Sequence, residues 1–448
     1  MKKLLLIILL SGTIFAQADL RHKISQMLMI GFPGTSVSDT MLINDLQKRE
    51  VGGVILFAAN VESPSQLQQL TTQLKSNSQV PLFISIDQEG GRVARLKASN
   101  GYANTSTAYE IGTILNNVFE TQSWAGLMAS WLYDGGINID LAPVADVDVN
   151  PTSPAIGYLD RSFSKIPDSV FIQCNWFINE FHQKNILNAL KHFPGHGSAA
   201  TDSHLGFTDI TDTWADSELI PFQKLIQSGY NDLIMSGHLY NANLDPEYPA
   251  SLSNKILSGL LRDSLGFEGL IITDGMFMNA ITENYSFEDA VALSINAGND
   301  ILLYTTNNLN GRSLVDSVVN IVVNKITQGA ITETRIDESY NRIMLKKQSL
   351  TSIRELADNM LPDEYGLINY PNPFNSSTQI NVKIAKPGIL SIKVYSVIGE
   401  EVAEIVNNFY EAGTHKFYFN SKELSSGVYL LRMSIGEKNI SHKIVLLK

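Results

Sequence analysis

The chain has 448 residues, a length typical of two or three domains, and its 44% hydrophobic and 17% charged residues indicate a folded protein with a large core. The net charge of −12 argues against a protein that follows the phosphate backbone of a nucleic acid, because such a protein needs a basic surface. A neutral or cationic ligand fits this charge better. Cys174 is the single cysteine, so an intrachain disulfide is excluded, and its apolar neighbours predict a buried, unreactive thiol.

The first 18 residues have the pattern of a secretion signal. Lys2 and Lys3 precede an apolar run, residues 4–10, and Ala16-Gln17-Ala18 offers small residues at a cleavage point. A membrane-spanning anchor is the alternative, but it needs about 20 apolar residues, and Asp19 interrupts the sequence too early. We therefore expect export without stable membrane insertion.

From residue 26 onward, short apolar runs alternate with longer amphipathic segments. We expect strands at residues 26–31, 53–57, 82–87, 137–142, 187–192, 233–238, 270–274 and 300–303. Helical patterns in the gaps include residues 39–49, 64–75, 167–182, 216–228, 253–264 and 287–297. This alternation predicts an α/β fold, a (β/α)8 TIM-type barrel. An open, doubly wound α/β sheet is the alternative, but the sequence lacks the Gly-rich phosphate loops that such a sheet would carry.

After about residue 350 the composition changes. A stretch rich in Pro and Asn, residues 363–375, predicts a linker and turns. Alternating apolar residues follow, with turns at Gly388, Gly399, Gly413 and Gly427, so we expect a small all-β sandwich of about 80 residues. This segment has no concentrated catalytic constellation, which favours an addressing or binding role.

The most informative stretch begins at the end of the expected strand 187–192. It reads K-H-F-P-G-H-G at residues 191–197 and D-S-H at residues 202–204. Pro194 and the neighbouring glycines predict that the strand stops near His192 and continues as a loop. In a barrel of this type the carboxyl ends of the strands carry the active site. Other ionisable residues also lie in or just after the carboxyl halves of expected strands: Asp87, Asp140, His238 and Asp274.

Asp202 and His204 lie two residues apart in this loop. If the loop is locally extended, both side chains face the same way, and the carboxylate orients and polarises the imidazole. Such a histidine can donate and accept a proton near neutral pH. The alternative is a helix-capping Asp beside a surface His, but the adjacent motif 191–197 favours function. We expect His196, which lies between two glycines, to hold the loop together.

Asp274 ends a run of strand-forming residues and is a candidate nucleophile towards an electrophilic carbon. A helix N-cap is an equal alternative for this residue. Asp87 follows another expected strand, where it could hold a sugar hydroxyl, while Glu89 and Arg92 are a candidate ion pair that braces the loop.

Three basic residues are candidates for contacts with a ligand. Arg161 is either a ligand contact or a brace for its loop. Lys191 and His192 can donate hydrogen bonds to hydroxyl groups.

Two other chemistries fit the sequence less well. Potential metal ligands are present at His192, His196, Asp202 and His204, but the sequence has neither an H-E-x-x-H helix nor an H-x-H strand pair. A serine hydrolase would carry a G-x-S-x-G turn between a strand and a helix, and none is present. We therefore expect neither a metal ion nor a cofactor.

Together these motifs resemble glycoside hydrolase family 3, and within it the single-domain β-N-acetylglucosaminidases. The resemblance covers about residues 20–350, through D-Q-E-G-G-R-V at 87–93, D-R-S-F at 160–163, the central motif at 191–204 and I-I-T-D-G-M at 271–276. It implies a retaining exo-β-N-acetylglucosaminidase that acts without a cofactor. Its implied substrates are terminal N-acetyl-β-glucosaminides in peptidoglycan fragments or chitooligosaccharides.

The resemblance also implies a role for each matching residue. Asp274 would form a covalent glycosyl-aspartate intermediate, and His204, held by Asp202, would be the acid/base in place of a second carboxylate. The positions that match sugar-binding residues are Asp87, Arg161, Lys191 and His192. A β-glucosidase of the same family is an alternative, but the intact D-S-H loop and the lack of a second α/β domain favour the N-acetylglucosaminide. The other alternative is a catalytically silent glycan-binding barrel.

The C-terminal segment resembles the sorting domain of the type IX secretion system. The resemblance covers about residues 367–448, through N-Y-P-N-P-F-N at 369–375, V-Y-S-V-I-G at 394–399, G-V-Y-L-L at 427–431 and K-I-V-L-L-K at 443–448. A carbohydrate-binding module is the alternative, but this segment has no Trp on which a sugar could stack. The resemblance implies the type IX machinery as a partner and passage through the periplasm to the cell surface or the medium. We expect a signal peptide at 1–18, the barrel at 19–355, a linker at 356–368 and the sorting domain at 369–448.

Overall fold

The computed structural model describes residues 19–359, 365–370, 372–375, 377–421, 424–436 and 438–446. The expected secretion signal, residues 1–18, lies outside the described residues. The chain forms two compact units that divide between Thr351 and Ser352. Helix α10 (Glu333–Asn359) crosses this division, β13 (Gly366–Tyr370) belongs to the second unit, and residues 360–364 of the expected linker lie outside the described part of the chain.

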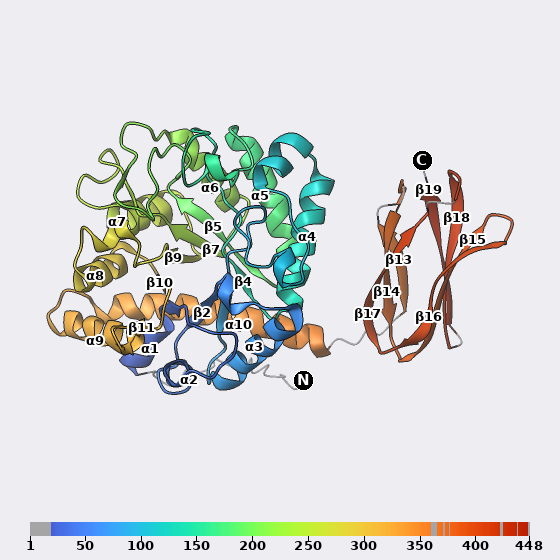
Figure 1. Cartoon of the computed structure of the whole chain (residues 1–448), viewed down its shortest axis with the longest axis horizontal. Helices are drawn as coiled ribbons and strands as arrows, with labels where there is room; N and C mark the ends of the chain where they lie inside the picture. Colours follow the sequence, from blue (N-terminus) through green and yellow to red (C-terminus); the bar gives the residue numbers. More distant parts are fainter. Residues whose placement is uncertain are drawn as a thin grey trace, which may run out of the picture. The chain divides into compact units, whose positions relative to one another are not determined.

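The first unit is built on an eight-stranded parallel sheet in the order β10-β1-β2-β3-β4-β5-β7-β9. A parallel bridge between Ile272 and Ile301 and a hydrogen bond from the Thr273 N–H to the Ile301 carbonyl join β9 to β10 and bring the sheet round into a barrel. The expected (β/α)8 barrel is therefore confirmed (Figure 1). The strands are β1 (Leu28–Ile30), β2 (Gly53–Leu56), β3 (Phe83–Ile86), β4 (Ile139–Asp140), β5 (Leu187–Phe193), β7 (Leu233–Ser236), β9 (Leu270–Thr273) and β10 (Leu302–Tyr304).

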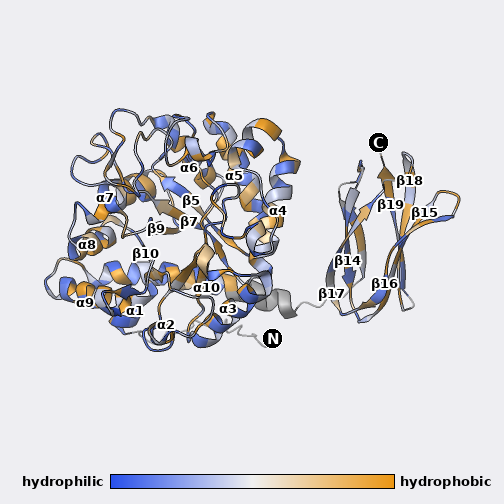
Figure 2. Cartoon of the chain, viewed as in Figure 1, coloured by the Kyte–Doolittle hydropathy of each residue, from blue (hydrophilic) through white to orange (hydrophobic). Residues whose placement is uncertain are grey.

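Helices surround these strands, and several begin with a sequence signal for a helix start (Figure 1). Ser63 caps α3 and Pro64 is its first residue, where a missing N–H costs nothing. Figure 2 shows polar and apolar colours alternating along outer helices such as α9, as expected of helices with one face on a core. The helices besides α10 are α1 (Leu20–Gln26), α2 (Thr40–Gln47), α3 (Pro64–Asn77), α4 (Val118–Asp134), α5 (Pro167–His182), α6 (Ile220–Gln227), α7 (Asn279–Thr282), α8 (Phe287–Ala297) and α9 (Leu314–Thr327).

Shorter elements lie in the connections. The 3-10 and π segments are η1 (Ala58–Asn60), η2 (Ala98–Asn100), η3 (Glu110–Leu115), η4 (Gly157–Leu159), η5 (Asp216–Leu219), η6 (Ala250–Leu252) and η7 (Lys255–Ser264). Two small strand pairs are β6 (Thr208–Asp209) with β8 (Leu239–Tyr240), and β11 (Asn308–Leu309) with β12 (Arg312–Ser313).

The barrel strands are buried on both faces, so they have continuous apolar runs whose ends periodicity defines poorly. Strand β1 is shorter than expected, because Gln26 ends α1 and the Met27 N–H donates to the Ile24 carbonyl. The expected helix 216–228 is divided between η5 and α6, and the expected helix 253–264 is largely the π segment η7.

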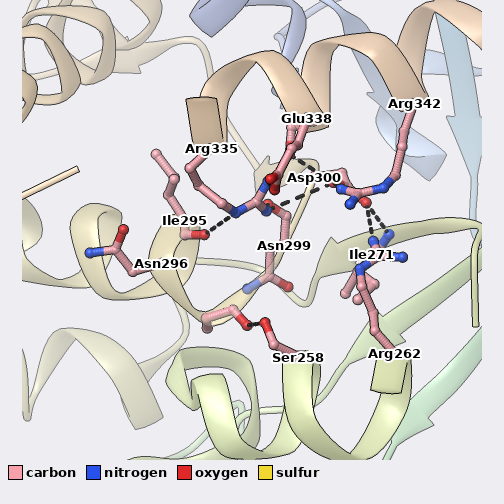
Figure 3. Close-up of polar contacts among 12 residues, drawn as sticks. Ser258, Arg262, Ile271, Ile295, Asn296, Asn299, Asp300, Arg335, Glu338 and Arg342 are labelled. Atoms are coloured by element: carbon pink, nitrogen blue, oxygen red, sulfur yellow. Dashed lines mark hydrogen bonds and ion pairs between the residues drawn. The ribbon is translucent and has the colours of Figure 1, made fainter. Parts of the chain in front are cut away.

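One buried carboxylate ties β9 and β10 to α10. Asp300 directly precedes Ile301 and β10, and its side chain is fully buried. Figure 3 shows Arg262, Arg335 and Arg342 around this carboxylate. Its oxygens accept hydrogen bonds from Arg262 (2.6 Å), Arg342 (2.8 Å), the Ser339 hydroxyl (2.7 Å) and the Ile271 N–H (3.0 Å).

The second unit contains two antiparallel sheets, β13-β14-β17 and β16-β15-β18-β19. A single core of buried residues draws on both sheets, including Ile380 and Val382 from β14 and Ile392 and Val394 from β15. The expected small all-β sandwich is therefore confirmed. Besides β13, its strands are β14 (Ser377–Ile384), β15 (Gly388–Ser396), β16 (Glu401–Tyr410), β17 (Gly413–Asn420), β18 (Gly427–Ile435) and β19 (Lys438–Leu446).

Across the part of the chain that the structure describes, no helix combines the length and the apolar composition needed to cross a membrane.

Candidate active site

Strand β5 carries Lys191 and His192 near its carboxyl end, as the sequence predicts. The Lys191 side chain is only 2% exposed, and its ammonium group lies 2.8 Å from Asp87 Oδ1 and 2.6 Å from Glu89 Oε1. Burial by itself lowers the pKa of Lys191, but the two carboxylates raise it above the ordinary value. Lys191 is therefore a charged donor that joins β5 to the loop after β3.

Arg161 extends this network from the loop after β4. Its Nε donates to Glu89 Oε2 (2.8 Å) and its Nη2 to Glu89 Oε1 (2.7 Å), the two-point geometry that a guanidinium makes best. The expected pair between Glu89 and Arg92 is therefore wrong, because Arg92 lies 3.3 Å from Asp160 instead. Burial tends to raise the pKa of Glu89, but the charges of Arg161 and Lys191 hold it below the usual range.

Asp146 organises the start of the central loop, and sequence reasoning did not single it out. This fully buried side chain accepts hydrogen bonds through Oδ1 from the backbone N–H groups of His192 (3.0 Å) and His196 (2.8 Å). Its Oδ2 lies 2.7 Å from His192 Nδ1, which leaves His192 Nε2 facing Arg161 at 3.4 Å. Asp146 lies six residues after β4, and the signal was a carboxylate within the apolar run 141–147.

The Asp202 and His204 side chains meet, with His204 Nδ1 2.8 Å from Asp202 Oδ1. The reason differs from the expected extended loop: the same Oδ1 accepts the backbone N–H of His204 (3.0 Å), so a tight turn brings the two residues together. The side-chain hydrogen bond lowers the pKa of Asp202 to about 2 and raises the pKa of His204. The His204 side chain is 59% exposed, so its Nε2 is available to a ligand.

The base of this loop is packed tightly. A Cβ atom on Gly197 would lie 1.6 Å from the Val147 carbonyl oxygen, so only glycine fits there. His196 is buried with its Nε2 3.3 Å from Ser203 Oγ, which agrees with the expected role of holding the loop. Burial lowers the pKa of His196 to about 4 and raises the pKa of Glu218, which contacts the Ser198 N–H, to about 7.

Asp274 follows β9 directly and is partly exposed. Its backbone N–H donates to the Ser236 carbonyl (3.0 Å), and its Oδ1 accepts the Gly275 N–H (2.7 Å). The helix-cap alternative is wrong, because the next helix, α7, begins at Asn279 and its N-cap residue is Met278. Asp274 is therefore a carboxylate at the end of a strand that does not cap a helix.

Asp274 and His204 influence each other although the chain separates them by 70 residues. Burial tends to raise the pKa of Asp274, but attraction from His192 and His204 holds it below the ordinary range. The hydrogen bond from Asp202 is the main reason for the raised pKa of His204, and attraction to Asp274 adds to it. The pKa shifts therefore make Asp274 an ionised carboxylate and His204 a basic imidazole.

Two other sequence expectations concern metals and the cysteine. Nowhere among the described residues do three or more His, Cys, Asp or Glu side chains form a group able to hold a metal ion. Cys174 is fully buried, and burial raises the pKa of its thiol well above the ordinary value.

The chain matches two protein-family models. Residues 19–345 match the glycosyl hydrolase family 3 N terminal domain, and residues 369–447 match the secretion system C-terminal sorting domain. The second match supports export or a location at the cell surface.

Two similar proteins are named as beta-hexosaminidases. A beta-hexosaminidase of Tolumonas auensis is 35% identical over an alignment of 286 residues, which covers 62% of this chain and 84% of the relative. Beta-hexosaminidase A of Pseudoalteromonas piscicida is also 35% identical, over 58% of this chain, but the match spans only 46% of that longer relative.

The chain is also similar to solved structures of enzymes named for the same class of sugar. A glycoside hydrolase family 3 beta-N-acetylglucosaminidase from Paenibacillus sp. str. FPU-7 is 31% identical with a TM-score of 0.68, over 75% of this chain and 63% of that one. A beta-N-acetylhexosaminidase from Beutenbergia cavernae is 27% identical with a TM-score of 0.68, over 75% of this chain and all of that chain. With its barrel, its ordered motifs and a family model that matches most of its length, the chain belongs to glycoside hydrolase family 3.

Proposed function

We propose that this protein is an exported, retaining exo-β-N-acetylglucosaminidase that hydrolyses terminal N-acetyl-β-glucosaminides. The observation that carries this proposal is geometric: Asp274 directly follows β9, and His204, hydrogen-bonded to Asp202, lies in the loop after β5 at the same end of the parallel barrel. The similar proteins named beta-hexosaminidase and beta-N-acetylglucosaminidase support the choice of sugar. Peptidoglycan fragments and chitooligosaccharides are the proposed natural substrates, because both end in this sugar.

In this proposal four residues hold the terminal sugar. Asp87, Lys191 and Arg161 belong to the buried network around Glu89, and His192 faces Arg161. Because Lys191 and Arg161 are already paired with carboxylates, they are fixed in place before a ligand arrives and lose little entropy on binding. Asp87 accepts hydrogen bonds from sugar hydroxyls, and the basic residues donate them.

The proposed reaction has two steps. In the first, an Asp274 oxygen bonds to the anomeric carbon, the glycosidic bond breaks, and the proton on His204 Nε2 passes to the leaving oxygen. Asp202 accepts a hydrogen bond from the Nδ1–H of His204 and stays ionised, so it orients the ring with Nε2 outward. In the second step, His204 Nε2 takes a proton from water, whose oxygen bonds to the anomeric carbon and releases Asp274.

The route of export is also a proposal. The segment at 1–18 would direct the chain into the periplasm, and the C-terminal sorting domain would engage the type IX machinery for passage across the outer membrane. The domain limits, with the barrel at 19–355, a linker at 356–368 and the sorting domain at 369–448, belong to the same proposal.

The activity is tested by comparing the hydrolysis of aryl N-acetyl-β-glucosaminide and aryl β-glucoside by the purified chain. We expect the N-acetylglucosaminide to be the better substrate, and proton NMR of the first product formed should show the β-anomer. A higher rate on the glucoside would identify a β-glucosidase instead. Sugar binding by calorimetry with no turnover of any glycoside would identify a silent glycan-binding barrel.

A further inference from the structure

His238 follows β7 at the same end of the barrel as the candidate catalytic groups, and the two steps above do not use it. Its side chain is 1% exposed and links two neighbours: Nε2 lies 3.0 Å from the Gly275 carbonyl oxygen, and Nδ1 lies 2.7 Å from Ser251 Oγ. A carbonyl oxygen only accepts hydrogen bonds, so Nε2 carries a proton. Burial lowers the pKa of His238, so the ring is neutral. Its Nδ1 therefore accepts a hydrogen bond from the Ser251 hydroxyl.

The Gly275 peptide that His238 holds is the one that follows Asp274. The Gly275 N–H donates to Asp274 Oδ1 (2.7 Å), and the backbone of this segment is held on both sides. On one side the Asp274 N–H donates to the Ser236 carbonyl (3.0 Å), and on the other the Met276 N–H donates to the Leu303 carbonyl (2.9 Å). The Gly275 carbonyl accepts two hydrogen bonds, one from the Met278 N–H (2.9 Å) within the turn and one from His238 Nε2, which is the side-chain donor that ties it to β7.

Ser251, the second partner of His238, is held by Asn299. The Asn299 side chain donates to the Ser251 carbonyl (2.8 Å), and its oxygen accepts the Ser236 hydroxyl proton (2.8 Å). Figure 3 shows Asn299 between Asp300 and Arg335, and Arg335 Nη2 donates to the Asn299 carbonyl (2.7 Å). The three side chains of Ser236, Ser251 and Asn299 are fully buried. Because an unpaired buried polar group is costly, this network favours a single arrangement.

We propose that His238, held by Ser251 and Asn299, positions the Asp274 carboxylate for attack on the anomeric carbon. This inference rests on the proposed function, which makes Asp274 the nucleophile. Attack requires the two reacting atoms to lie about 3–3.5 Å apart with the correct alignment, and a misplacement of about 1 Å costs roughly 100-fold in rate. His238 is a positioning residue, because it acts through the Gly275 peptide and not on the sugar.

The test compares three variants in the full chain. His238→Phe keeps a ring of similar shape but removes the side-chain donor to the Gly275 carbonyl and leaves the Met278 N–H donor, while His238→Gln keeps a side-chain N–H donor. The matched control is His182→Phe. His182 is the last residue of α5, and its side chain is hydrogen-bonded to Asp232. Each variant is measured for kcat, KM, thermal unfolding and the rate of covalent labelling by a mechanism-based fluorinated glycoside at a temperature where all are folded.

We expect His238→Phe to lower kcat and the labelling rate together, by roughly 10- to 100-fold, with KM within about twofold of the wild type. His238→Gln should recover part of this loss, and His182→Phe should keep kcat even if its thermal unfolding temperature falls. The inference is overturned if folded His238→Phe labels and turns over as fast as the wild type, or if its loss only follows its folded fraction. A wild type that neither cleaves nor is labelled by any glycoside would overturn the proposed function itself.

Discussion

Two carboxylates of the barrel unit, Asp300 and Asp274, differ in how many hydrogen-bond donors the protein supplies to them. Asp300 receives hydrogen bonds from two arginines, a serine hydroxyl and a backbone N–H, and a third arginine lies 3.8 Å away. Asp274 is partly exposed and accepts a single hydrogen bond among the described residues, from Gly275. The protein supplies the hydrogen-bond partners of Asp300, whereas one oxygen of Asp274 stays available to a ligand. A buried charge is therefore not by itself a sign of an active site. A carboxylate that is held in place but still has an oxygen without a hydrogen-bond donor from the protein is such a sign.

The largest effect on activity is expected at Asp274. Replacement Asp274→Ala removes the oxygen that would bond to the anomeric carbon, so kcat for N-acetyl-β-glucosaminide cleavage should fall by at least about 10³-fold. Denaturant unfolding should change little, because this carboxylate makes few contacts with the protein. Turnover that survives in the variant would remove Asp274 from the nucleophile role.

The opposite result is expected at Asp300. Replacement Asp300→Ala leaves the charges of Arg262, Arg335 and Arg342 without their shared partner, and the free energy of unfolding should fall by about 3–5 kcal/mol. All four tryptophans lie between residues 124 and 214, so tryptophan fluorescence in urea follows this unit alone.

The control for Asp300 is an ion pair on the surface. Asp168 lies 2.7 Å from Lys224 and both side chains are largely exposed, so Asp168→Asn should cost less than about 1 kcal/mol. An equal cost for the two variants would show that the buried cluster contributes nothing special.

A smaller effect that depends on the substrate is expected at His204. Replacement His204→Ala removes the proton donor, so glycosides with poor leaving groups should slow by roughly 10²- to 10⁴-fold. Activated aryl glycosides need little protonation of the leaving oxygen and should slow less. Rates measured across a series of leaving groups test this, and equal losses on all of them would contradict the role as an acid.

The smallest effect is a shift along the pH axis at Asp202. The hydrogen bond from Asp202 raises the pKa of His204, and the first step needs the protonated imidazole. The value of kcat/KM should therefore decline as pH rises through that elevated pKa. In Asp202→Asn the main cause of the elevation is gone, so this decline should move to lower pH. An unchanged basic limb would place the titrating group elsewhere.

Much of the barrel could be predicted from the chain itself, because local patterns report burial directly. Eight apolar runs with amphipathic segments between them indicate parallel strands covered by helices, and all eight strands are present. Strand ends were less certain, since a run such as Met27–Ile30 stays apolar across the boundary between α1 and β1. Five of the helices, α1, α4, α7, α9 and α10, were not among the expected segments.

Some residues of the candidate site could be predicted from the sequence, and others could not. Lys191, His192, Asp202, His204 and Asp274 stand in compact motifs at strand ends, where residue type and place in the barrel suggest chemistry. Asp146 lies in a loop away from any motif, so only the folded chain brings it to His192 and His196. The pairing of Glu89 with Arg161 is likewise a contact across 72 residues, and the nearer Arg92 was the wrong partner.

By itself the sequence determined the order of the elements, the type of barrel and the segment that carries the polar motifs, because each depends on residues close together in the chain. Only the tertiary structure decided which charges pair, which pKa values move and which carboxylate is left open. Those properties depend on distances and burial between segments far apart, such as β5, β7 and β9. His238 illustrates the difference: its position after a strand was visible in the sequence, whereas its hold on the Gly275 peptide exists only in the folded chain.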